Sequence, residues 1–168
     1  MIPNAPPTED GRRTFSVARA IYDACRRAGH RIDVPVLEKL LYLSHGWSLA
    51  VTDRALLSEP FVVEAYGPVL ISLTRLRRVY ERSLLPEHDG DRIFGPDCVP
   101  FAEGIPQLEV ILRVVDTYAG FTGWRLSALT RWPDGAQERA LRDGLALLTD
   151  PAIRADFVAM AHAGRAAA

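Results

Sequence analysis

The fold of this chain is decided by the stretch Leu37-Glu38-Lys39-Leu40-Leu41-Tyr42-Leu43-Ser44-His45-Gly46-Trp47-Ser48-Leu49-Ala50. Apolar side chains follow a helical spacing along Val36, Leu40 and Leu43, and a second apolar stripe lies beside the first. A helix with two apolar stripes is buried over much of its circumference, so we predict that this helix is central to the fold. It should begin after an N-cap at Asp33 and run to about residue 51. Gly46 interrupts it at a cost of about 1 kcal/mol relative to alanine, which a close neighbouring backbone would explain.

Further helices and a small β element are indicated outside this stretch. The helices are predicted at about residues 14–28, 68–82, 106–118, 122–131, 136–148 and 151–163. Pro68 fits the first position of the second of them. A short strand at residues 61–65 is predicted to pair with another at residues 92–94, inside a long loop rich in Pro, Gly and Asp. The expected fold is mainly α, a single compact helical domain with a small two- or three-stranded β element.

Length, charge and cysteine content restrict the class of protein. The chain has 168 residues, 48% of them hydrophobic and 24% charged, which suits one globular domain with its own core. The net charge is −1, from 20 Lys and Arg against 21 Asp and Glu, so no basic field draws the chain to nucleic acid or acidic lipid. No run approaches the roughly 20 apolar residues of a membrane span, and the two cysteines and four histidines lack a zinc-binding spacing. We expect a reduced, cytoplasmic protein without metal, cofactor, membrane or nucleic-acid partner.

The two ends of the chain differ in composition from its middle. Residues 1–13 are Pro-rich and polar and are expected to form a flexible N-terminal arm. Residues 164–168 are expected to form a flexible tail. The domain itself is expected to span residues 14–163, without internal repeats.

No catalytic motif stands out in the sequence. It contains no G-x-S-x-G elbow, no Walker A loop, no G-x-G-x-x-G and no H-E-x-x-H. His45 has no matching nucleophile, so we interpret it as a partly buried polar residue that bonds a backbone carbonyl rather than as a general base. We therefore predict no catalytic residues and no enzyme activity. A hydrolase that uses His45, Glu64 or Asp116 is the alternative.

An arginine-rich segment is the strongest charge feature. Arg75, Arg78 and Arg82 share a helix face at i, i+3 and i+7, with Arg77 alongside. This face could hold a phosphate or an acidic protein, or it could be a solvated helix surface. Acidic residues follow closely at positions 81, 87, 89 and 91, which weighs against phosphate more than against a protein partner.

Two further features are candidates for a protein interface. Gly67 and Pro68 should set a rigid corner before the arginine-rich helix, and a rigid corner presents side chains such as that of Tyr66 at low entropic cost. Trp132 lies in a turn between helices and is predicted to lie at the surface, whereas Trp47 is predicted to lie in the core. The corner, the arginine face and Trp132 make up the predicted partner-binding surface.

Two segments together resemble the Panacea domain, the family of the SocA-like antitoxins. The first is the stretch quoted above followed by Glu64-Ala65-Tyr66-Gly67-Pro68-Val69, which matches the family's Lys-Leu-Leu-Tyr helix, Gly-Trp pair and Gly-Pro-Val corner in order. The second runs from Val114-Val115-Asp116-Thr117-Tyr118 to Leu126-Ser127-Ala128-Leu129-Thr130, and residues 153–157 fit the closing helix of the family. The likeness extends from about residue 15 to residue 157. It is broken at Arg131, where the family has histidine, and at Trp132-Pro133, which reverses and shifts the family's Pro-Trp pair.

The resemblance implies a bacterial antitoxin that binds a protein toxin directly and acts without catalysis. A SocA-like member would further be a proteolytic adaptor, which delivers a SocB-like toxin to the ClpXP protease. The predicted toxin-binding residues are then Tyr66, Gly67, Pro68, Arg75, Arg78, Arg82 and Trp132. Ala167 and Ala168 are the predicted contact with ClpX, because a free Ala-Ala end resembles the chain ends that ClpX engages. A fraying Ala-rich helix is the other interpretation of this tail.

A winged-helix-like DNA-binding regulator is the alternative function. Such proteins have a helix, helix, strand, helix order, and the arginine-rich helix of this chain would take the place of their DNA-reading helix. The net charge of −1 and the acidic neighbours of that helix weigh against this alternative.

Overall fold

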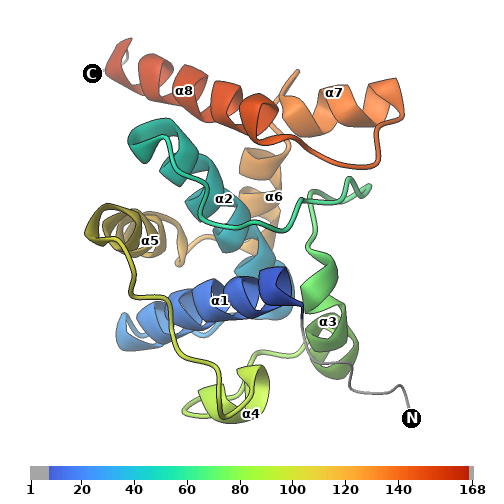
Figure 1. The fold of residues 1–168 in the computed structure, drawn as a ribbon. Helices are drawn as coiled ribbons and strands as arrows, with labels where there is room; N and C mark the ends of the chain where they lie inside the picture. Colours follow the sequence, from blue (N-terminus) through green and yellow to red (C-terminus); the bar gives the residue numbers. More distant parts are fainter. Residues whose placement is uncertain (1–7, 167–168) are drawn as a thin grey trace.

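Helices make up most of the structure (Figure 1). The computed structural model describes residues 8–166, with side chains up to residue 164. Its elements are α1 (Glu9–Arg27), α2 (Val34–Thr52), the 3-10 helix η1 (Ile71–Leu73), α3 (Thr74–Tyr80), α4 (Gly90–Phe94), α5 (Ile105–Tyr118), α6 (Gly123–Thr130), α7 (Ala136–Asp143) and α8 (Asp150–Ala166). The prediction of a mainly α fold is confirmed. No helix within this range combines the length and the apolar character that crossing a membrane requires.

α2 lies at the centre of the helix assembly, with α5, α6 and α8 around it (Figure 1). It begins after Asp33, whose carboxylate Oδ1 accepts the backbone N–H of Val36 at 2.8 Å, and it ends at Thr52. Leu37 and Leu40 are completely buried, and burial of each contributes about 1.5–3 kcal/mol of hydrophobic free energy. The predicted N-cap and the predicted central position of this helix are both confirmed.

Gly46 allows α8 to lie directly on α2. The ring of Phe157 from α8 fills the space that a Cβ of residue 46 would occupy. This ring makes edge-to-face contacts with Tyr42 and Trp47, at 5.8 and 5.2 Å between ring centroids, and Phe157 is 1% exposed. The sequence indicated a close neighbour at this glycine, but that neighbour is an aromatic side chain rather than a backbone.

The small β element does not form as predicted. Within residues 8–166 no segment forms a strand, and Val62 instead makes two isolated antiparallel bridges, to Val69 and to Leu147. The N–H of Val62 donates to the carbonyl of Val69 at 2.8 Å, and the N–H of Val63 donates to that of Ala146 at 2.9 Å. The helix, helix, strand, helix order of the winged-helix alternative is therefore absent from the described residues.

The strand predicted at residues 92–94 is wrong, because these residues belong to the short helix α4. Ile93 and Phe94 are both buried, whereas neighbouring residues of a strand would point to opposite faces. A helical turn, in which the N–H of Ile93 donates to the carbonyl of Asp89 at 3.0 Å, brings both side chains inward. Phe94 there meets Phe15 and Tyr22 of α1 edge to face.

The two terminal helices are longer than predicted. α1 begins at Glu9 rather than at about residue 14, because the Thr8 hydroxyl caps it by accepting the N–H of Gly11 at 3.1 Å. Residues 9–13 are therefore helical, and residues 1–7 of the predicted arm lie outside the described residues. α8 extends to Ala166, so that only residues 167 and 168 of the predicted tail lie outside.

Two internal helices are shorter than predicted for local backbone reasons. Pro68 does not begin a helix, because Val69 is held in the bridge described above and α3 starts only at Thr74, after η1. α7 ends at Asp143 because Gly144 takes a left-handed conformation with φ of 68°. The residues after this turn are then free to bridge to the segment around residue 62 instead of continuing the helix.

Replacing Gly46 with alanine should destabilise the protein. The new methyl group would overlap the ring of Phe157, and such overpacking costs about 1–3 kcal/mol, more than the helix propensity that alanine gains. Urea unfolding measures the loss, with Gly123→Ala as the matched control, because an added Cβ there has no atom within 4 Å. Adding Phe157→Leu to Gly46→Ala should recover part of the loss. A Gly46→Ala protein as stable as the wild type would contradict this contact.

Candidate functional site

His45 joins three parts of the chain and is not accessible to a substrate. Its ring is 1% exposed. Nδ1 accepts the backbone N–H of Leu57 at 3.2 Å, so the neutral ring carries its proton on Nε2, which donates to Oδ1 of Asp150 at 2.9 Å. The predicted bond to a backbone carbonyl is wrong, because the ring meets a backbone donor instead. The two bonds agree with the interpretation of His45 as a structural residue.

The hydrolase alternative is not supported by the geometry around His45. A general base must reach the proton that it removes, and the nitrogens of His45 are both engaged with other groups. Glu64 and Asp116 are exposed, on a loop and on α5 respectively. Nowhere in residues 8–164 do three or more His, Cys, Asp or Glu side chains gather in a way that could hold a metal ion.

The predicted Tyr66-Gly67-Pro68 corner is a tight turn with an exposed aromatic ring. The N–H of Gly67 donates to the carbonyl of Glu64 at 3.1 Å, and Gly67 has φ of 122°, a conformation that L side chains rarely adopt. Gly67 and Pro68 are buried, whereas Tyr66 is 86% exposed. The amide of Gln137 donates to the carbonyl of Glu64 at 2.7 Å, which fixes the turn against the start of α7.

Trp132 lies on the segment after α6, next to this corner. A Cβ at Gly67 would stand 3.5 Å from the hydroxyl of Thr130, at the end of α6. Trp132 follows two residues later and is 40% exposed, as predicted for a surface residue. Nearby Arg131, at the position where the resembling family has histidine, pairs with Glu138 at 3.0 Å. The corner and Trp132 are thus brought to adjoining segments.

The arginine face is smaller than the sequence suggested. Arg75 and Arg78 are exposed on α3, but the helix ends at Tyr80 and Glu81 has φ of 44°, so that Arg82 lies outside the helix. None of the three predicted arginines has a hydrogen-bond or ion-pair partner among the side chains described. Two exposed guanidinium groups on one helix face, with a third beyond its end, therefore remain available to a partner.

Arg77 does not join this face, because it points inward and pairs with Glu38 of α2. Glu38 is 5% exposed, and burial raises the pKa of its carboxyl, whereas the nearby Arg77 opposes the rise. The N–H of Leu70 also donates to Glu38 at 3.4 Å. This buried ion pair ties α3, and with it the exposed arginines, to the central helix.

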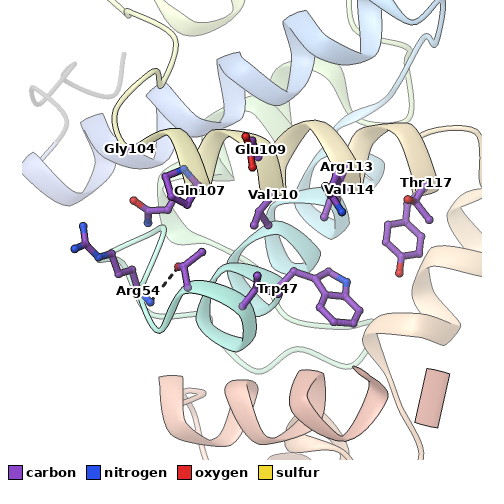
Figure 2. Close-up of a pocket in the computed structure, with 13 residues that line it drawn as sticks. Trp47, Arg54, Gly104, Gln107, Glu109, Val110, Arg113, Val114 and Thr117 are labelled. Atoms are coloured by element: carbon purple, nitrogen blue, oxygen red, sulfur yellow. Dashed lines mark hydrogen bonds between the residues drawn. The ribbon is translucent and has the colours of Figure 1, made fainter. Parts of the chain in front are cut away.

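A groove between α2 and α5 is a feature that the sequence reasoning missed. It has a volume of about 940 Å³, and Figure 2 shows its two walls. The lining residues are Trp47, Val51, Thr52 and Arg54 on the α2 side and Gly104, Pro106, Gln107, Glu109, Val110, Arg113, Val114, Thr117 and Tyr118 on the α5 side.

A sequence signal for this groove exists. Pro106, Val110, Val114 and Tyr118 recur at every fourth position and form an apolar stripe along α5. Such a stripe is usually core, which is why spacing alone did not reveal a groove.

Trp47 is half-buried rather than fully in the core. One side of its ring meets Phe157 at 5.2 Å between centroids, and another part lines the groove. The prediction that Trp47 is a core residue is therefore correct for its contact with α8 only.

The bond between His45 and Asp150 should make stability depend on pH in the acid range. Hydrogen bonding by His45 lowers the pKa of Asp150, so the carboxylate stabilises the fold at neutral pH and this contribution is lost as the pH falls from about 4 through the folded-state pKa. The position of Asp150 in the first turn of α8 also favours the carboxylate, because the positive end of the helix dipole stabilises a negative charge there.

Asp150→Asn should therefore be less stable than the wild type at about pH 7, and the difference should shrink toward about pH 3. Urea unfolding across this range measures it, with Asp116→Asn, an exposed aspartate on α5, as the control. A difference that stays constant with pH would contradict a role for the charge of Asp150.

Comparison with known protein families matches residues 37–135 to the family described as antitoxin SocA-like, Panacea domain. The matched segment is more than half of the chain and runs from the first turns of α2 to the residue before α7. It contains the corner, the arginines of α3 and Trp132. No curated protein and no solved structure matches the chain. The resemblance seen in the sequence is confirmed, and the chain belongs to the SocA-like antitoxin family defined by the Panacea domain.

Proposed function

We propose that this chain is an antitoxin that neutralises a protein toxin by direct, non-catalytic binding. Membership of an antitoxin family supports the class of function. The observation that carries the proposal is the exposed Tyr66 on a rigid turn, at the entry to a helix with unpaired arginines. Aromatic rings and arginines are the residue types most often responsible for affinity at protein interfaces.

The corner supplies affinity at low entropic cost. Gly67 and Pro68 are buried, and Gln137 holds the carbonyl before the turn, so Tyr66 is presented by a backbone that is already ordered. Binding then loses little backbone freedom. Trp132 adds a second exposed ring on the adjoining segment. This surface comprises the residues Tyr66, Gly67, Pro68, Arg75, Arg78, Arg82 and Trp132.

The arginines favour a toxin with an acidic contact surface. Arg75 and Arg78 have no acidic partner within the molecule, so carboxylates of a toxin would meet guanidinium groups that are not already neutralised. Their attraction acts mainly on the association rate and weakens as salt is added.

Reversing both charges with Arg75→Glu and Arg78→Glu should weaken toxin binding and leave the melting temperature nearly unchanged. Both side chains are exposed, and substitutions at such positions usually alter stability by less than about 0.5 kcal/mol. Co-purification with the protein encoded by the neighbouring gene measures binding, and growth rescue on co-expression measures neutralisation. The matched control is Arg12→Glu with Arg27→Glu, two exposed arginines of α1. Undiminished binding and rescue by the α3 variant would reject this surface.

We further propose that neutralisation ends in degradation, with the chain as an adaptor that delivers a SocB-like toxin to ClpXP. The SocA-like family membership supports this step. Ala167 and Ala168, the proposed contact with ClpX, follow the end of α8 and lie outside the described residues. A tail that ClpX holds while the folded body holds the toxin would raise the local concentration of toxin at the protease.

With purified ClpXP, the chain should accelerate degradation of the toxin. Ala167→Asp with Ala168→Asp should retain toxin binding and slow degradation toward the rate without adaptor, because the tail would no longer resemble an Ala-Ala end. Ala155→Asp, at an exposed alanine of α8, is the control. If the wild-type chain never accelerates degradation, the adaptor step is wrong and direct neutralisation stands alone. If it does so and the tail variant is equally active, ClpX is contacted elsewhere.

A further inference from the structure

We propose that the groove between α2 and α5 is a second docking site, which takes a short amphipathic segment of a protein partner with apolar side chains and carboxylates. The site is distinct from the surface assigned to the toxin. α5 and α3 lie to either side of α2 (Figure 1), and the corner and the arginines belong to the α3 side. The inference therefore goes beyond the proposed function and does not depend on it.

The length and openness of the groove fit a chain segment better than a small molecule. It follows α5 from Gly104 to Tyr118, which at about 1.5 Å per residue is roughly 20 Å. Val51, Glu109 and Arg113 are exposed along its edges. Small-molecule sites usually bury about 70–90% of the ligand surface, which a groove open along such a length does not do. A helix of about 14 residues or a shorter extended segment matches it.

The apolar lining is already organised for binding. The ring of Trp47 is held by Phe157 of α8, and Figure 2 shows it facing the stripe of α5. At the same end, the ring of Tyr118 rests edge to face on Phe121 at 5.5 Å, and the guanidinium of Arg125 lies 3.6 Å from the centre of the Phe121 ring. Aromatic anchors whose neighbours fix them lose little entropy when a partner docks.

The charges at the groove determine the chemistry of its occupant. Arg54 and Arg113 are among its lining residues, and the guanidinium group of neither has an ion-pair or hydrogen-bond partner among the described residues. Glu109 lies one turn before Arg113 without pairing with it. The lining thus carries more positive than negative charge, and an apolar segment with carboxylates complements it better than a neutral or basic one.

The test is a selection of random displayed peptides, about 14 residues long, against the full chain. The enriched peptides should share apolar residues at helical or alternating spacing together with Asp or Glu. Their affinity is then measured by fluorescence anisotropy against wild type, Val51→Glu and Arg113→Glu. Val51→Glu should weaken binding about tenfold or more, by placing a carboxylate on the apolar wall. Arg113→Glu should weaken it several-fold, with the larger effect at low salt.

Matched controls are Val99→Glu and Arg12→Glu, at an exposed valine and an exposed arginine that do not line the groove. They should bind the peptides as the wild type does, and melting curves should show every variant folded. Selected peptides that bind the groove variants and the wild type equally would overturn the proposal. It would also be overturned if no acidic, apolar peptide is enriched, or if dodecanoate binds while peptides do not, since the groove would then be a site for a small amphiphile.

Discussion

The structure depends on the contact between Gly46 and Phe157. Without a Cβ at residue 46, the ring of Phe157 can lie against the backbone of α2, and this contact seats α8 on the central helix. The same ring supports Tyr42 and Trp47, and so it sets where the wall of the α2–α5 groove stands. At the residue next to Gly46, the bond between His45 and Asp150 fixes the start of α8. The aromatic contact and the hydrogen bond therefore hold α2 and α8 in the same register relative to each other.

α2 supports two different surfaces through two different kinds of interaction. Toward α3 it uses the buried pair of Glu38 and Arg77, which adds little net stability compared with apolar residues but strongly penalises any arrangement that leaves one charge unpaired. Toward α5 its contacts are mainly apolar, and one long hydrogen bond joins the two helices, in which the amide of Gln107 donates to the hydroxyl of Ser48 at 3.5 Å. The ion pair therefore ties the exposed arginines of α3 to the central helix, and the packing of α5 on the same helix forms the groove.

Features that depend on residues close together in the sequence could be predicted, whereas features that depend on contacts between distant segments could not. The N-cap at Asp33 and the double stripe of α2 are encoded within a few turns, and both are found. The pairing of the segment around Val62 depends in part on a distant segment: besides nearby Val69, its partner is Leu147, after Gly144, and each contact is a single bridge. Residues 92–94 are too few for their spacing to distinguish a strand from a helical turn.

For the candidate site, too, the sequence predicts part of the arrangement and misses the part that depends on contacts between helices. Tyr66 of the corner, Trp132 and the three predicted arginines are at the surface, although only Arg75 and Arg78 belong to α3. Spacing could not show that Arg77 points inward, because the partner that attracts it, Glu38, comes from another helix. The groove escaped notice for the same reason: an apolar stripe on α5 becomes a groove only if no third element covers it.

The contacts of α2 have a consequence for where this domain ends as a physical unit. The family is recognised over residues 37–135, yet the groups that complete its central helix lie beyond: Asp150 for His45, and Phe157 for Gly46. Asp156 likewise caps α7 from α8, by accepting the N–H of Ala136 at 2.6 Å. A recombination event that exchanged only the recognisable segment would leave a buried imidazole without its carboxylate and a bare glycine facing water. Any unit that is inherited, fused or exchanged intact must therefore carry α8 with it.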